Sequence, residues 1–93
     1  MTKEEVLEFL EEENPEAMLF ENPSFEKAII GYTKNNFGNF VAVYDYNEMV
    51  DSLVEEYSAD SEDPYTDAVE WIEYNSMRSL PYMGENAPAI IYT

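Results

Sequence analysis

The sequence contains no cysteine and no histidine, and only four of its 93 residues are lysine or arginine. Without cysteine, no disulfide framework and no thiolate nucleophile can form. Without histidine, a Ser–His relay and a zinc knuckle are both excluded. Proteins contact the phosphates of DNA and RNA through Lys and Arg, so four basic residues argue against direct nucleic-acid binding.

Long hydrophobic runs are missing as well. No run approaches the roughly 20 apolar residues that a membrane-spanning helix requires. The chain begins Met1-Thr2-Lys3-Glu4-Glu5, which is acidic and unlike a signal peptide. An anionic membrane surface would repel so acidic a protein. We therefore predict a protein of the cytoplasm that has no membrane partner.

Carboxylates dominate what is present, because 21 Asp and Glu against four bases give a net charge of −17. The hydrophobic fraction is nevertheless 45%, which argues against disorder. Residues 1–93 are expected to form a single domain with a small core rich in aromatic side chains.

The sequence of the first third predicts one helix, followed by a segment for which several structures are compatible. Thr2 and Glu5 have the spacing of a capping box, and apolar residues recur at helical spacing behind them. The pattern predicts a helix over residues 3–13 that ends at Asn14-Pro15. Residues 15–26 are compatible with an irregular connection, a short helical turn or a short edge strand.

Three segments are typical of strands. Residues 28–33 and 40–44 are apolar runs on either side of an Asn/Gly cluster, which predicts a β-hairpin. A third strand is expected within residues 88–92, where it could pair beside the hairpin.

Two further helices are expected between the hairpin and the last strand. An Asp-x-x-Glu start at Asp45 and an i, i+3, i+4, i+7 apolar pattern predict a helix over residues 46–58. Asp63 followed by Pro64 predicts the start of another over residues 64–79. The order α-β-β-α-α-β predicts an α+β domain, with helices packed on a three-stranded antiparallel or mixed sheet.

The negative charge is unevenly distributed along the chain. Residues 1–26 hold nine carboxylates and one lysine, whereas residues 27–44 hold no carboxylate and two lysines. Residues 45–73 hold eleven carboxylates and no base. Like charges three or four residues apart on a helix repel, and interleaved lysines would have relieved that repulsion. The unrelieved charge suggests that the electric field of this segment is useful.

This pattern favours a non-enzymatic acidic interaction protein, in the form of a DNA mimic that binds the basic surface of a nucleic-acid-binding protein. Two acidic helices joined by an acidic loop approximate a short stretch of DNA charge. The candidate partner-binding residues are Asp45, Glu48, Asp51, Glu55, Glu56, Asp60, Glu62, Asp63, Asp67, Glu70, Trp71 and Glu73. One continuous acidic face would support this hypothesis.

The alternative is a small accessory or structural module whose acidity is incidental, with the carboxylates forming a solvated surface. Such a module could be a homodimer that associates through the hairpin edge or Trp71. Trp71 lies beside the apolar Val69/Ile72 pattern, where it is either the edge of the core or an exposed contact residue.

Catalytic and metal sites are not indicated. Carboxylate pairs suited to acid–base chemistry, such as Glu70 with Glu73, are diluted among 21 acids. Asp60, Glu62 and Asp67 crowd one loop with Asp63, but the EF-hand pattern is absent and Asp63 is better explained as a helix cap. We predict no catalytic residue, no metal site and no cofactor.

Arg78 and the tyrosines have structural interpretations. As the only arginine, Arg78 is interpreted as an anchor between the last helix and the C-terminal segment. The tyrosines are interpreted mainly as amphipathic packing residues at Tyr32, Tyr44, Tyr46, Tyr57, Tyr65, Tyr74, Tyr82 and Tyr92.

Several stretches resemble a family of proteins. These are Ala28-Ile29-Ile30-Gly31, Val43 to Val50, Ala68 to Asn75, and the Leu80-Pro81-Tyr82-Met83-Gly84-Glu85-Asn86-Ala87-Pro88 segment. Over residues 25–93 the chain resembles small, largely uncharacterised acidic proteins of bacteriophages and mobile elements. That resemblance implies action in the host cytoplasm against a host defence, as anti-CRISPR or anti-restriction inhibitors act. It implies no particular site residue.

Overall fold

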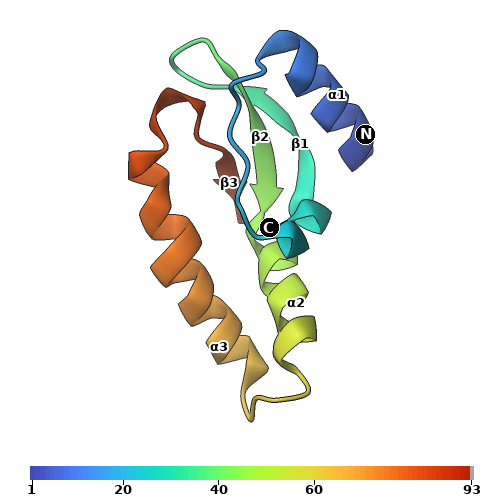
Figure 1. The fold of residues 1–93 in the computed structure, drawn as a ribbon, viewed down its shortest axis with the longest axis vertical. Helices are drawn as coiled ribbons and strands as arrows, with labels where there is room; N and C mark the ends of the chain where they lie inside the picture. The colour runs from blue at the N-terminus through green and yellow to red at the C-terminus, as the bar shows by residue number, and fades with distance from the viewer. Residues whose placement is uncertain (93) are drawn as a thin grey trace.

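Helix α1 occupies Lys3–Glu13, as the sequence predicts, in a computed structural model that describes residues 1–92 (Figure 1). Its capping box is complete. The Glu5 amide donates to Thr2 Oγ1 at 3.2 Å, and the Thr2 amide donates to Glu5 Oε1 at 2.9 Å. The helix ends at Asn14, whose amide donates to the Leu10 carbonyl at 2.8 Å.

The segment that the sequence left open ends in the 3₁₀ helix η1, Pro23–Ala28. Asn22 caps η1 by accepting a hydrogen bond from the Ser24 amide at 3.0 Å, and Pro23 fits its first turn. Phe25 and Ala28 are buried, and η1 packs against the helix that follows the hairpin. The end of this segment is therefore packed into the fold, whereas residues 15–22 form an irregular connection.

The sheet is mixed and has the order β1-β2-β3. Strands β1, Ile29–Lys34, and β2, Phe40–Asp45, form the expected antiparallel hairpin, with a β-bulge at Ile30. Strand β3, Ala89–Ile91, pairs in parallel with the other side of β2. The prediction begins the first strand one residue early, because Ala28 ends η1 instead.

Helix α2, Tyr46–Tyr57, continues directly from β2, and the Asp45 side chain caps it by accepting from the Asn47 amide at 2.9 Å. Helix α3 spans Pro64–Trp71 and continues into a π-helical segment, η2, at Ile72–Met77. Two further helical residues, Arg78 and Ser79, bring the helix to its predicted end. The 3₁₀ turns η3, Leu80–Tyr82, and η4, Gly84–Asn86, lead to β3.

The core joins α1, η1, β2, α2 and α3. Phe9 of α1 stacks on Tyr32 at 3.8 Å between ring centroids and meets the edge of Phe40 at 5.0 Å. The helices α2 and α3 pack along each other and extend beyond the sheet (Figure 1), so the molecule is elongated at 43 × 27 × 22 Å. The fold is the expected α+β domain. None of the helices within residues 1–92 is long and apolar enough to cross a membrane.

Candidate partner-binding surface

Three carboxylates of α2 lie on one side of the helix. Glu48, Asp51 and Glu55 follow an i, i+3, i+7 spacing, which places them on a common face that we call the α2 acidic face. All three are exposed. Met49 and Leu53, on the opposite side, are completely buried.

A lysine distant in sequence relieves the charge on this face. Lys27 Nζ lies 2.8 Å from Glu55 Oε2, and this contact raises the pKa of Lys27 and lowers that of Glu55. Glu48 and Glu56 also raise the pKa of Lys27 through their negative charge. Glu56 itself accepts a hydrogen bond from the Ser24 hydroxyl. The base-free segment 45–73 is thus partly neutralised by η1.

Helix α3 carries a second acidic face, which points in a different direction. Asp67 and Glu70 are exposed and lie opposite the buried Ala68 and Ile72. Because the buried sides of α2 and α3 pack against each other, their acidic sides point in different directions, with Asp67 at the flank of α3 near Tyr57 of α2. We call Asp67 and Glu70 the α3 acidic face. Segment 45–73 therefore presents two acidic faces on different sides of the protein.

The loop between the helices is also acidic. Asp60 and Glu62 are exposed there. Asp63 caps α3, as expected, and the pKa of Asp63 is lowered by hydrogen bonds from the Thr66 hydroxyl and amide. Asp67 accepts a hydrogen bond from the Ser61 hydroxyl. Across residues 1–92, no group of three or more acidic side chains is arranged to hold a metal ion.

The remaining candidate residues have structural contacts. Asp45 is half-buried at the α2 cap, and Glu73 accepts a hydrogen bond from the Tyr46 hydroxyl at 2.9 Å. Trp71 packs edge-on against the buried Phe25, with ring centroids 5.8 Å apart. Trp71 thus forms the edge of the core.

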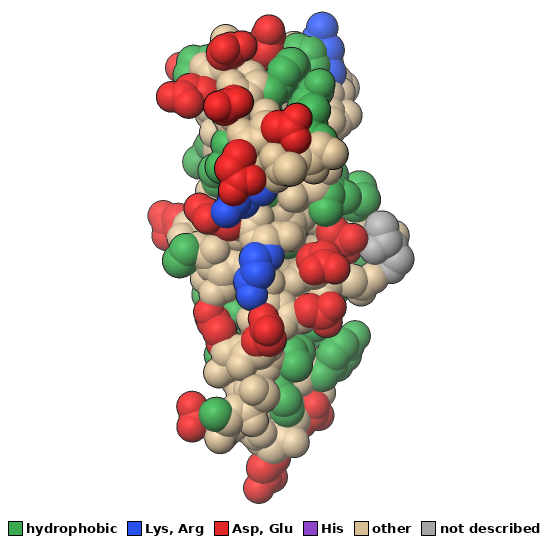
Figure 2. Space-filling model, turned by 90° about the vertical axis from the view of Figure 1, so that its right-hand side faces the viewer, with side chains coloured by type: hydrophobic (Ala, Val, Ile, Leu, Met, Phe, Trp, Pro, Cys, Tyr) green, Lys and Arg blue, Asp and Glu red, His purple; other side chains and the backbone are tan. Residues whose placement is uncertain are grey.

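Charge on the remaining surface is dispersed. Every carboxylate except that of Asp45 belongs to an exposed residue. Figure 2 shows acidic side chains along the whole length of the side where α1 lies, separated by hydrophobic and uncharged groups, with basic side chains near the middle and at the top end. The ion pairs within residues 1–92 join Lys3 to Glu4 and Glu26, and Lys27 to Glu55. The α3 acidic face takes part in none of these pairs.

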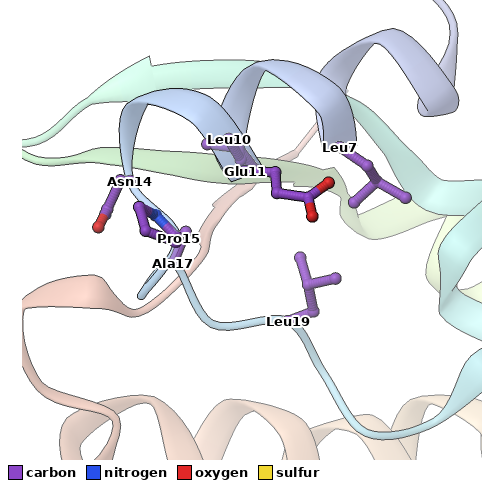
Figure 3. A pocket seen from close by; sticks show the side chains of 7 residues that line it. All are labelled: Leu7, Leu10, Glu11, Asn14, Pro15, Ala17 and Leu19. Atoms are coloured by element: carbon purple, nitrogen blue, oxygen red, sulfur yellow. The ribbon is translucent and has the colours of Figure 1, made fainter.

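The cavities are small. One of about 250 Å³ lies between α1 and the chain that follows it, where Leu7 and Glu11 face Leu19 (Figure 3). Another of about 460 Å³ lies beside Trp71 and the π-helical segment. Neither holds a set of polar groups that suggests a reaction.

No protein family, curated protein or solved structure matches the chain.

Two groups of residues were not anticipated from the sequence. Lys27 acts on α2 from 28 positions away, and no local pattern indicates that contact. Four of the tyrosines assigned to packing are well exposed, namely Tyr65, Tyr74, Tyr82 and Tyr92. Arg78 lies over the Tyr74 ring, 5.2 Å from its centroid. Tyrosine spacing alone could not separate the packed rings from the exposed ones.

The pKa of the Tyr46 hydroxyl is raised from 10.0 to about 12 by burial and by its hydrogen bond to Glu73. This is the largest pKa shift among the residues of the candidate surface and their contacts. The neutral form of Tyr46 therefore stabilises the fold fully below pH 10, and this contribution is lost as the pH rises through about 12. Tyr46→Phe cannot ionise, so we expect its free energy of unfolding to fall less steeply over this alkaline range. Urea unfolding at a series of pH values, with NMR titration of the tyrosine ring carbons, measures both effects. Ionisation of native Tyr46 near pH 10 would contradict the assignment.

Proposed function

We propose that this protein is a non-enzymatic acidic interaction protein that binds the basic, nucleic-acid-binding surface of another protein. In the setting implied by its resemblance to phage and mobile-element proteins, that partner is a host nucleic-acid-binding protein, and the effect is inhibition through DNA mimicry. The observation that carries the proposal is the amount of exposed negative charge along an elongated body.

The linear density of this charge approaches that of DNA. A net charge of −17 over a length of 43 Å corresponds to one negative charge per about 2.5 Å. Duplex DNA carries one per about 1.7 Å of its axis. Phosphates also surround the duplex axis, so acidic faces on several sides are compatible with mimicry of its field. A basic groove would attract such a body over long range and accelerate association.

The α3 side supports the proposal better than the α2 side. Lys27 pairs with the α2 acidic face, whereas the α3 acidic face belongs to none of the ion pairs within residues 1–92. A basic partner would therefore meet a stronger field at α3. We propose that side as the principal contact surface.

The alternative function, an accessory or structural module with incidental acidity, is favoured by one observation. The two acidic faces point in different directions and do not form one continuous surface. A solvated acidic surface needs no common direction, whereas a single docking interface would contact one side more than the other.

Competition with DNA distinguishes the two functions. The immobilised protein is incubated with nuclease-treated bacterial lysate at about 50 mM and about 200 mM NaCl, and bound proteins are challenged with a short DNA duplex. We expect proteins that bind at the lower salt concentration, that the duplex displaces and that the higher salt concentration releases. An uncharged polysaccharide is the control competitor and should displace nothing. Capture that neither salt nor DNA reverses would contradict mimicry.

A further inference from the structure

Two tyrosines and a glutamate from different elements meet at the end of the sheet. The parallel register pairs Asp45 with Ile91. The residues that follow them, Tyr46 at the start of α2 and Tyr92 after β3, therefore lie close together. Their rings lie 4.8 Å apart between centroids and are tilted by 39°. Figure 1 shows strand β3 ending near the start of α2.

The π-helical segment η2 contributes the third member of this group. Glu73 Oε2 accepts the hydrogen bond from the Tyr46 hydroxyl at 2.9 Å. We call Tyr46, Tyr92 and Glu73 the tyrosine cluster.

The cluster presents aromatic surface and negative charge to solvent together. Tyr92 is 66% exposed, and Glu73 is exposed as well. A carboxylate offers about four acceptor sites, and the Tyr46 hydroxyl takes one of those of Glu73. Glu73 belongs to none of the ion pairs within residues 1–92. Its remaining acceptor capacity therefore lies beside Tyr46 and the exposed ring of Tyr92.

We propose that the tyrosine cluster binds an arginine side chain of the partner, an inference that rests on the proposed function and specifies one contact of it. A guanidinium can donate two parallel hydrogen bonds to a carboxylate while it stacks on an aromatic face. A lysine ammonium lacks both the planar fork and the stacking surface. Tyrosine and arginine are also the residue types that carry much of the binding energy in interfaces.

Charge complementarity favours an arginine of a basic protein over a nucleic acid or a second copy of the chain. A nucleic acid would be repelled by the net charge of −17, and so would a second copy of the chain. The protein's own arginine, Arg78, lies over Tyr74, outside the cluster. A basic protein surface that ordinarily contacts phosphates supplies arginine side chains, so it satisfies both the charge and the chemistry.

The test compares hexa-arginine with hexa-lysine peptides by isothermal titration calorimetry on the full chain. We expect the intact protein to bind hexa-arginine roughly two- to fivefold more tightly, as a cation–π contact at an exposed site allows. Glu73→Gln and Tyr92→Ala should remove this preference. Tyr92→Phe retains the ring and should keep the preference for hexa-arginine. Circular dichroism melts confirm that each variant is folded.

Glu70→Gln is the matched control, because it makes the same charge change on the same helix outside the cluster. It should weaken both peptides equally and leave the preference for arginine intact. Equal binding of the two peptides by the intact protein would overturn the inference, as would an equal loss of preference in Glu70→Gln and Glu73→Gln. The peptides test the cluster without a host partner, so failure of the DNA competition would overturn the proposed function separately.

Discussion

Reversing the charge of the α3 acidic face should weaken binding to a DNA-displaceable partner by at least about 100-fold at low salt. The variant is Asp67→Lys with Glu70→Lys, which changes the net charge from −17 to −13. The loss follows because two attractive contacts become repulsive, and a charge facing a like charge across an interface costs several kcal/mol. Surface plasmon resonance against the captured partner measures the effect on both association and dissociation rates.

A second variant with the same net charge serves as the control. Glu48→Lys with Asp51→Lys alters the α2 acidic face at the same i, i+3 spacing and also gives −13. We expect it to slow association through the weaker overall field, with an affinity loss of about tenfold. Equal losses in the two variants would mean that only the net charge matters. No loss in either variant would exclude both acidic faces from the interface.

Glu55 and Glu56 are less suitable positions for such a test, although the sequence places them in the same acidic run. Glu55 is paired with Lys27, and Glu56 accepts a hydrogen bond from Ser24. Reversing either charge would disturb the contact between η1 and α2. The measured loss of binding would then include a change in the packing of η1 on α2, whereas the side-chain hydrogen bond of Asp67 joins it only to Ser61 in the adjoining loop.

Local patterns predict the elements of this fold well. The capping box at Thr2 and Glu5 sets the start of α1, and Asp63 followed by Pro64 sets the start of α3. Each signal depends on residues within one helical turn of the boundary. The π-helical segment within the last helix was not anticipated, because an apolar spacing pattern does not distinguish it from an α-helix.

The arrangement of the candidate surface could not be predicted in the same way. The direction of each acidic face depends on which sides of α2 and α3 pack together, and therefore on contacts between distant residues. The tyrosine cluster requires β3 to pair in parallel with β2, so that Tyr92 reaches Tyr46. Lys27 reaches Glu55 because η1 is packed on α2. The sequence therefore shows how much charge there is, and the tertiary contacts determine where it points.

Phe25 is the residue whose loss should most damage this arrangement. Its side chain is 0% exposed and lies between Phe20, at 6.2 Å between ring centroids, and Trp71, at 5.8 Å. Phe25→Ala should lower the free energy of unfolding by about 3–5 kcal/mol, because it removes apolar contacts and leaves a cavity. For a domain of this size, the midpoint of thermal unfolding should fall by at least about 10 °C.

Phe37→Ala is the matched control for this substitution. Phe37 lies in the hairpin turn and is 64% exposed, so the same change should alter stability by less than about 0.5 kcal/mol. Phe25 also anchors η1, so its loss should release Lys27 from Glu55 and restore the pKa of Glu55 toward its ordinary value. Thermal unfolding and NMR titration of Glu55 measure the two effects. A normal melting temperature, or an unchanged Glu55 pKa in folded Phe25→Ala, would show that the position of η1 does not depend on this side chain.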